Sequence, residues 1–172
     1  MIRKAKKNDI ENIMKAINDA VNLLKDNNVN QWQNGYPNRE VFTEDISKGT
    51  LWVVEKDDKI AGVCNICIDD DISYEKIYHG SWLTKGSSYM VIHRIAVKKE
   101  FYNQGIAKEM FMFAEKEAKK YNISSIRIDT HKFNIPMNQI LTKFNYIRCG
   151  IIYLVNSRDE DKERVAYEKI LI

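Results

Sequence analysis

A strand that runs straight into a helix is the feature that most constrains how this chain can fold. Residues 88–97 read as an apolar strand, and residues 105–121 follow as a helix with one apolar stripe. Gly105 stands in the polar turn between them. The first N–H groups of a helix have no partner inside it, and the positive end of the helix dipole lies there. The turn is therefore either an ordinary strand–helix connection or a binding site for a pyrophosphate.

The other segments alternate between strand and helix patterns. Asp9 is expected to cap a helix over residues 10–24, whose apolar residues follow helical spacing. Asp57-Asp58 is expected to form the turn of a hairpin. The order of the elements predicts an α/β fold of mixed α+β type, with one mixed sheet of about seven strands and about four helices. Further strands are predicted at residues 2–6, 50–56, 59–68, 72–78, 124–131, 146–155 and 164–171, and further helices at 39–47 and 134–144.

Composition excludes several functional classes. The 172 residues suffice for one domain with a single core, and no run approaches the ~20 apolar residues that a membrane span needs. The 27 basic and 24 acidic residues give a net charge of +3, which is too balanced for a nucleic-acid interface. Three cysteines, an odd number, indicate reduced thiols and a cytoplasmic location. Cys64 and Cys67 lack a second pair or a nearby histidine for zinc, so we expect no metal site and interpret both as buried structural residues.

Two stretches resemble the signatures of the GNAT superfamily of N-acetyltransferases. In IAVKKEFYNQGIAKEM, residues 102–107 resemble the acetyl-CoA signature Gln/Arg-x-x-Gly-x-Gly/Ala, except that Tyr102 replaces Gln or Arg. In NIPMNQILTKFNY, Asn134 opens a helix as in the second signature, while Asn145-Tyr146 replaces Gly-Phe. RVAYEKIL is similar to the family's final strand. The resemblance covers residues 1–172 as a single acetyltransferase domain, and it implies a mostly antiparallel sheet with two splayed central strands.

The resemblance also implies how acetyl-CoA is bound. The backbone of Ile95 and Val97 would pair with the pantetheine arm, and residues 103–108 would hold the pyrophosphate. Asn134 would reach the cofactor between the splayed strands. The residues expected to contact acetyl-CoA (coenzyme A) are Ile95, Ala96, Val97, Tyr102, Asn103, Gln104, Gly105, Ile106, Ala107, Lys108, Asn134 and Met137.

Acetyl transfer to an amine needs a group that removes a proton. A lysine-like amine with a pKa near ~10.4 is almost entirely protonated at pH 7, and histidine titrates in a suitable range. By period-two alternation, His93 is expected on the same face as Ile95 and Val97. Arylalkylamine N-acetyltransferases, which HRIAV resembles, have a histidine at that position. His131 shares a strand face with Asp129, which could orient or charge its ring. A structural role is the alternative for each histidine.

The general acid and the acceptor site are less well defined. Many family members use a tyrosine where this chain has Leu141, so an unprotonated thiolate, water, Tyr153 or Cys149 remain as alternatives. A role of Cys149 as acyl carrier is set against the simpler interpretation of a buried thiol. The acidic run at residues 69–71 is interpreted as a solvated turn rather than a cation site. The aromatic residues expected to bind the acceptor are Trp32, Tyr36, Trp82 and Tyr89.

The sequence therefore favours an acetyl-CoA-dependent N-acetyltransferase. We expect it to act on a primary amine of a small molecule or a peptide, by direct attack in a ternary complex. The expected catalytic residues are His93, His131 and Asp129. The alternative is a non-catalytic acyl-CoA-binding sensor or interaction module on the same fold. No nucleic-acid or membrane partner is expected, and both a monomer and a homodimer remain open.

Overall fold

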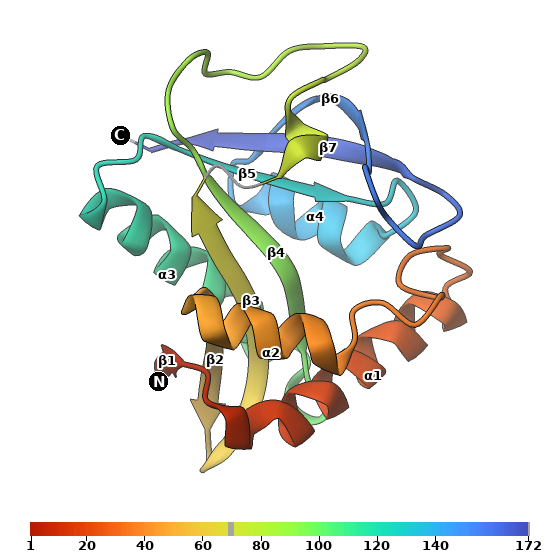
Figure 1. The fold of residues 1–172 in the computed structure, drawn as a ribbon, viewed down its shortest axis with the longest axis vertical. Coiled ribbons are helices and arrows are strands. Elements are labelled where there is room, and N and C mark those ends of the chain that lie inside the picture. The colour runs from red at the N-terminus through yellow and green to blue at the C-terminus, as the bar shows by residue number, and fades with distance from the viewer. Residues whose placement is uncertain (69–70, 172) are drawn as a thin grey trace.

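A twisted sheet crosses the whole molecule in this computed structural model, which describes residues 1–68 and 71–171 (Figure 1). Among these residues the sheet has seven strands in the order β1-β2-β3-β4-β5-β7-β6. The strands are β1 (Ile2–Lys4), β2 (Leu51–Lys56), β3 (Lys59–Ile68), β4 (Met90–Val97), β5 (Ser125–Thr130), β6 (Ile147–Tyr153) and β7 (Glu163–Ile170). The helices are α1 (Ile10–Asp26), α2 (Arg39–Lys48), α3 (Ile106–Lys120) and α4 (Ile135–Lys143).

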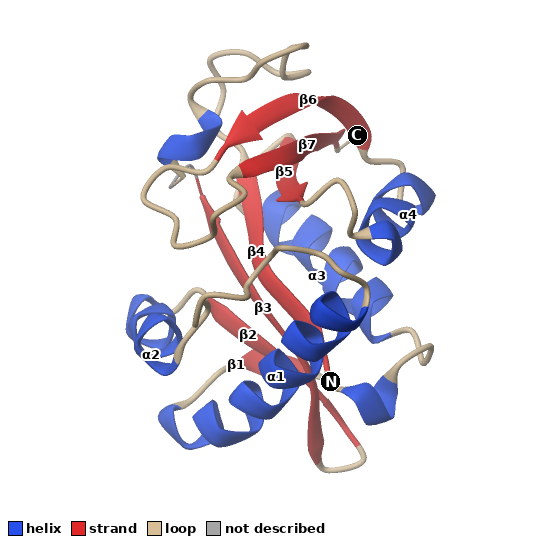
Figure 2. Cartoon of the chain, turned by 90° about the vertical axis from the view of Figure 1, so that its right-hand side faces the viewer, coloured by secondary structure: helices blue, strands red, loops and turns tan. Residues whose placement is uncertain are grey.

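Helices pack on both faces of the sheet. Ile13 and Ile17 of α1 and Phe42 of α2 bury their side chains against Val53 and Val63. Residues of α3 and α4 bury theirs with the other faces of β3, β4 and β5. Figure 2 shows the strands β2–β4 between α2 on one side and α3 on the other. The predicted mixed sheet with helices on its faces is confirmed.

The two central strands diverge. β4 and β5 are the parallel pair of the sheet, and they are in register only at Met90–Ile126 and Val91–Arg127. All other neighbouring strands are antiparallel. Beyond these two pairs the strands separate toward their carboxyl ends, so the expected splay is confirmed and opens a gap in the middle of the molecule.

A bulge in β4 overturns the expected placement of His93. Ala96 pairs with Val63 and His93 pairs with Asn65, so two residues of β4 face one of β3. Arg94 takes up the extra length with a φ of 50°. Ile95 therefore packs in the same cluster as Ile92, whereas His93 lies on the opposite face. The expectation that His93 shares a face with Ile95 is wrong, because an inserted residue reverses the alternation.

Three local predictions have different outcomes. Asp57 and Asp58 both have positive φ, at 51° and 57°, as a two-residue hairpin turn requires. The side chain of Asp9 does not cap α1, because it accepts hydrogen bonds from the Lys6 N–H and from the Arg3 guanidinium. The predicted strand at 72–78 is wrong: residues 72–74 form a 3₁₀ turn, and only an isolated bridge from Tyr78 reaches β6.

No helix in the described ranges has both the length and the apolar character needed to cross a bilayer.

Candidate active site

A cavity of about 1110 Å³ fills the gap between β4 and β5. Its walls come from the carboxyl half of β4, the start of α3, the end of β5 and the start of α4. The loop between α1 and α2 closes it with Trp32 and Tyr36. An ordinary small-ligand pocket measures roughly 300–1,000 Å³, so this cavity has room for a large ligand or for two ligands side by side.

One half of the cavity is built around the turn from β4 into α3. Gly105 precedes α3 with a φ of 81°, and a Cβ at this position would meet nothing within 4 Å. The N–H groups of Ile106, Ala107 and Lys108 are the first of the helix and have no partner inside it. These amides, the helix dipole and the open approach at Gly105 suit an anion such as a pyrophosphate.

Nearly all residues expected to contact acetyl-CoA line this half. The exception is Gln104, whose side chain accepts a hydrogen bond from Lys56 (2.7 Å) and donates one to the Glu100 carbonyl (2.9 Å). The others lie on the cavity wall: Ile95, Ala96, Val97, Tyr102, Asn103, Gly105, Ile106, Ala107, Lys108, Asn134 and Met137.

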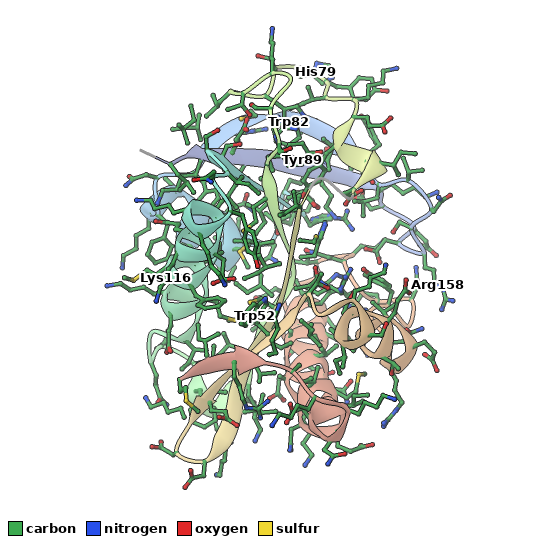
Figure 3. The ribbon with its side chains drawn as sticks, turned by 60° about the vertical axis from the view of Figure 1, so that its left-hand side comes forward. Trp52, His79, Trp82, Tyr89, Lys116 and Arg158 are labelled. Carbon is green, nitrogen blue, oxygen red and sulfur yellow. The ribbon has the colours of Figure 1, made fainter. Side chains whose placement is uncertain are left out.

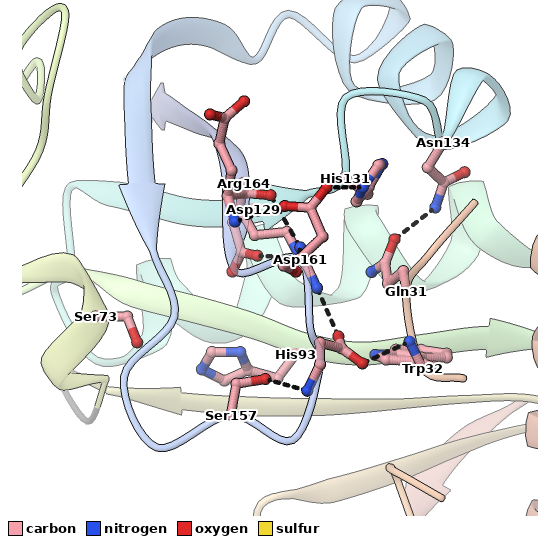
Figure 4. A network of polar contacts seen from close by, with 12 residues as sticks. Gln31, Trp32, Ser73, His93, Asp129, His131, Asn134, Ser157, Asp161 and Arg164 are labelled. Atoms are coloured by element: carbon pink, nitrogen blue, oxygen red, sulfur yellow. Dashed lines mark hydrogen bonds and ion pairs between the residues drawn. The ribbon is translucent and has the colours of Figure 1, made fainter. Parts of the chain in front are cut away.

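Asn134 connects the two halves of the cavity. Its Oδ1 accepts a hydrogen bond from the Met137 N–H at 3.3 Å and caps α4. Its Nδ2 donates to Gln31 Oε1 at 3.4 Å, across the gap to the α1–α2 loop (Figure 4). The same asparagine therefore begins α4 and contacts the loop that closes the other half.

That other half is dominated by charged side chains around His93. Asp71 Oδ2 lies 3.7 Å from His93 Nε2, and one ligand atom each of Asp71, His93 and Asp129 falls within 4.8 Å of the other two. Tyr74 donates its hydroxyl hydrogen to Asp129 Oδ1 at 2.7 Å. Burial raises the pKa of Asp129, although the Tyr74 hydrogen bond, His93 and Arg164 act in the opposite direction. The three residues come from a loop, β4 and β5, and they meet only in the folded chain.

A buried arginine forms the floor of this half. Arg164 donates to Asp159 Oδ2 at 2.6 Å and to the Asp161 carbonyl at 2.7 Å, and its Nε lies 4.0 Å from Asp129 Oδ2. The other oxygen of Asp159 accepts the Trp32 N–H at 3.0 Å. The cavity floor thus holds the α1–α2 loop in place through contacts between residues 127 positions apart.

A second arginine holds the opposite wall. Arg94, the bulge residue, donates to both oxygens of Asp45 at 2.9 and 2.8 Å and to the Tyr36 hydroxyl at 2.9 Å. Neither Arg94 nor Arg164 was predicted to lie at the site. An arginine directly after the candidate histidine was a usable signal for the first, whereas no local pattern marks the second.

The Acetyltransferase (GNAT) family matches residues 17–146 of the chain. The chain belongs to this family. Its relatives include an uncharacterized N-acetyltransferase of Bacillus subtilis (strain 168), YesJ, which is 26% identical over 144 residues, 83% of this chain and 78% of that protein. A GNAT-family acetyltransferase from Streptococcus agalactiae 2603 superimposes with a TM-score of 0.88 at 32% identity, over 100% of this chain and 95% of its own. The NatB acetyltransferase complex bound to CoA and MES shares the fold, with a TM-score of 0.69 at 13% identity over 100% and 99% of the two chains.

His131 does not lie in the cavity of this GNAT domain. It is buried, its Nε2 is 2.9 Å from Asp161 Oδ2, and its Nδ1 accepts the Phe133 N–H at 3.2 Å. Asp129 faces His93 and Tyr74 instead of orienting His131. The structure therefore brings His93 and Asp129 together and leaves His131 in a structural environment.

Trp82 and Tyr89, which are labelled in Figure 3, do not line the cavity either. Their rings pack on the Arg127 guanidinium, with its carbon 4.2 and 3.7 Å from the ring centroids. Arg127 in turn pairs with Glu168 at 3.2 Å. Of the four aromatic residues expected to bind the acceptor, only Trp32 and Tyr36 line the cavity.

The alternatives for a general acid are placed elsewhere in the domain. Leu141 is fully buried in the core, so the position that carries a tyrosine in many GNAT enzymes is apolar here. Burial raises the pKa of the Cys149 thiol, which donates to the Ile147 carbonyl. Tyr153 stacks edge-on against Tyr78 on the outside of the sheet. None of these three described side chains lines the cavity. Residues 69 and 70 of the acidic run lie outside the described residues, whereas Asp71 is part of the cavity wall and not a solvated turn.

Proposed function

We propose that this chain is an acetyl-CoA-dependent N-acetyltransferase that acetylates a primary amine of a small molecule or a peptide. The observation that carries the proposal is that one cavity joins an anion-binding turn, at Gly105, to a proton-accepting cluster, at His93 and Asp129. Membership in a family of acetyltransferases supports the same reaction. A thiol nucleophile such as Cys149 is not needed for this reaction, because an amine can attack a thioester directly.

The residues of the cofactor half fit acetyl-CoA. The open glycine at position 105 lets a phosphate approach the amides of α3, and Thr130 Oγ1, on the cavity wall, is buried without a hydrogen-bond partner among the described residues. Residues 103–108 would hold the pyrophosphate and Asn134 the pantetheine arm. The bound cofactor supplies the acetyl group as a thioester, whose carbonyl accepts the amine and whose thiolate leaves.

The residues of the other half handle the proton and the amine. His93 is placed to accept a proton from the incoming ammonium, and Asp129 and Asp71 stabilise the resulting imidazolium. Loss of that proton frees the nitrogen lone pair for the new N–C bond. The second proton leaves with the collapse of the tetrahedral adduct, to the departing sulfur or to water. Trp32 and Tyr36 form apolar walls around the acceptor.

Release of CoA thiol with a panel of primary amines tests this function. Thiol release above the rate without amine, with any acceptor, supports the enzyme. Binding of acetyl-CoA without turnover across the panel favours the sensor, the alternative that the buried Leu141 brings into consideration. We also infer a cytoplasmic location, since the three cysteines are free and buried and fit a reducing compartment.

A further inference from the structure

Asp71 is held in a fixed orientation toward His93. Its Oδ1 accepts the Ser73 N–H at 2.8 Å at the start of the 3₁₀ turn, so the carboxylate cannot rotate freely. Its Oδ2 then faces the imidazole at 3.7 Å. The side chains of Asp71 and His93 are only 20% and 16% exposed, which leaves them accessible from the cavity but largely shielded from bulk water. The Asp71 carboxylate is therefore an oriented part of the cavity wall and not a solvated turn residue.

Among the described residues, the charged side chains of this half do not balance. Of its carboxylates, Asp45 is neutralised by Arg94 and Asp159 by Arg164. Glu44 and Lys48 of α2 pair with each other at the rim. Of the carboxylates that the structure describes here, Asp71 and Asp129 remain, with His93 Nε2 3.7 Å from Asp71 Oδ2 and Arg164 Nε 4.0 Å from Asp129 Oδ2.

The hydrogen-bond acceptors on this part of the cavity wall are the carboxylate oxygens of Asp71 and Asp129. Oδ1 of Asp71 accepts the Ser73 N–H, and Oδ1 of Asp129 accepts the Tyr74 hydroxyl. Their Oδ2 atoms lie 3.7 Å from His93 Nε2 and 4.0 Å from Arg164 Nε, which is longer than a hydrogen bond. An ammonium brings three N–H donors and one positive charge, and so matches both the negative charge and the acceptor oxygens of the two carboxylates.

We propose that Asp71, His93 and Asp129 bind the ammonium form of the acceptor, and that the acceptor is a cationic amine without a carboxylate beside its amino group. This inference rests on the proposed function for its chemistry. Proton transfer from the ammonium to His93 stays inside the cluster, so the total charge of cluster and amine is unchanged while one N–H bond breaks. A carboxylate on the carbon that bears the amino group would lie against Asp71 and Asp129 and be repelled.

Matched acceptor pairs test the inference. The probes are tyramine with tyrosine and tryptamine with tryptophan, each pair compared by kcat/KM at saturating acetyl-CoA. We expect each decarboxylated amine to be preferred by tenfold or more over its amino acid. Asp71→Asn should raise the KM for the amine about tenfold and narrow that preference, while the KM for acetyl-CoA stays the same. Asn keeps the acceptor for the Ser73 N–H, so the turn is preserved.

Glu75→Gln is the matched control, because it removes one negative charge from the exposed side of the same turn. It should leave the amine preference unchanged. Equal or better transfer to the amino acids, or an unchanged amine KM in Asp71→Asn, would overturn the inference while leaving the acetyltransferase intact. If no acceptor is acetylated, calorimetric titration of tyramine into the CoA-bound protein still decides: binding lost in Asp71→Asn supports the site, and binding equal in the two proteins contradicts it.

Discussion

At the scale of single residues, the chemistry of His93 depends on which side chains surround it, and the bulge in β4 decides this. The ring lies close to the carboxylates of Asp71 and Asp129, on the face of the sheet opposite to Ile95 and Val97. In His131, by contrast, both ring nitrogens form hydrogen bonds, one with Asp161 and the other with the Phe133 N–H. Two histidines of similar sequence context thus have different expected roles.

His93→Ala should lower turnover by roughly 10²-fold, the usual scale of general acid–base catalysis. Acetyl-CoA affinity should be nearly intact, because the cofactor half is formed by other residues. The loss should shrink as pH rises toward the amine pKa, since an amine that is already neutral needs no base. Kinetics from pH 7 to pH 10 measure this.

His131→Ala is the comparison for that experiment. It removes a buried ring and should lower stability while leaving the turnover of the folded protein within a few-fold. A loss in His131→Ala as large as in His93→Ala, with little added loss in the double variant, would instead place both histidines in one relay.

Asp129→Asn should stabilise the fold at neutral pH while lowering activity. Burial raises the folded-state pKa of Asp129. Below the unfolded pKa of about 3.9 the side chain is protonated in both states, and no penalty exists. As pH rises above it, the unfolded chain ionises first, so stability is lost toward neutrality. The amide keeps an acceptor for the Tyr74 hydroxyl and avoids the penalty.

Thermal unfolding from pH 3 to pH 7 shows whether Asp129→Asn raises or lowers the stability of the fold. The melting temperature of Asp129→Asn should exceed that of the wild type at pH 7, with a difference that disappears near pH 3. Asp161→Asn should behave oppositely: burial opposes its ionisation, but hydrogen bonds from His131 and the Glu163 N–H lower its pKa overall. A lower melting temperature for Asp129→Asn at pH 7 would show that Tyr74, His93 and Arg164 outweigh burial.

At the scale of elements, the turn from β4 into α3 is the part that we propose holds the cofactor. Gly105→Glu places a side chain and a negative charge where the pyrophosphate is expected. In the wild-type protein, acetyl-CoA at 100 times its dissociation constant should raise the free energy of unfolding by ~2.7 kcal/mol. In a chain of this size, this raises the melting temperature by about 5–10 °C. The variant should lose that shift.

Gly86→Glu separates binding from backbone strain. Gly86 has a φ of 67° and open space around its Cβ position, as Gly105 does, but it does not line the cavity. Both variants pay a similar conformational cost, yet only Gly105→Glu should lose the acetyl-CoA response. An equal response in all three proteins contradicts the assignment of the turn.

The loop before β4 is anchored by a buried ion pair. Glu168 accepts the N–H groups of Leu83 and Thr84 and pairs with Arg127, which lies under Trp82. Glu168→Gln removes the charge and leaves the guanidinium buried, which should cost roughly 3–5 kcal/mol in urea unfolding. Lys169→Met, which breaks a partly buried pair with Glu115, should cost less, because both side chains of that pair still reach solvent. Similar costs for the two would mean that the Arg127 pair is not the anchor.

Local signals predicted the elements well and their junctions poorly. The two aspartates at 57–58 and the apolar stripes mark a turn and helices because neighbouring residues decide them. The bulge at Arg94 depends on how β4 pairs with β3, and its effect on His93 was therefore missed. Asp71 read as solvated because its contacts come from residues 22 and 58 positions away in the chain, at His93 and Asp129. Trp82 was predicted to bind the acceptor because no nearby sequence pattern indicates its contact with the Arg127 guanidinium.

At the scale of the whole molecule, the splay of β4 and β5 is what makes one site out of two. The half that we propose for the cofactor is lined by residues of α3 and α4, and the half that we propose for the acceptor is lined by residues of the α1–α2 loop and the loop before β7. Gln31 and Asn134 connect them directly. A single cavity with both halves predicts direct transfer from thioester to amine, without an acyl-enzyme on Cys149.

Single-turnover transfer of a labelled acetyl group tests this central claim most directly. Enzyme in excess is mixed with acetyl-labelled acetyl-CoA and a primary amine, and the label is followed in the amine and in the protein. We predict that the label appears on the amine without passing through the protein, in the wild type and in Gly86→Glu but not in Gly105→Glu. Label that accumulates on the protein first, or thioester that remains intact with every amine while acetyl-CoA is bound, would contradict the account.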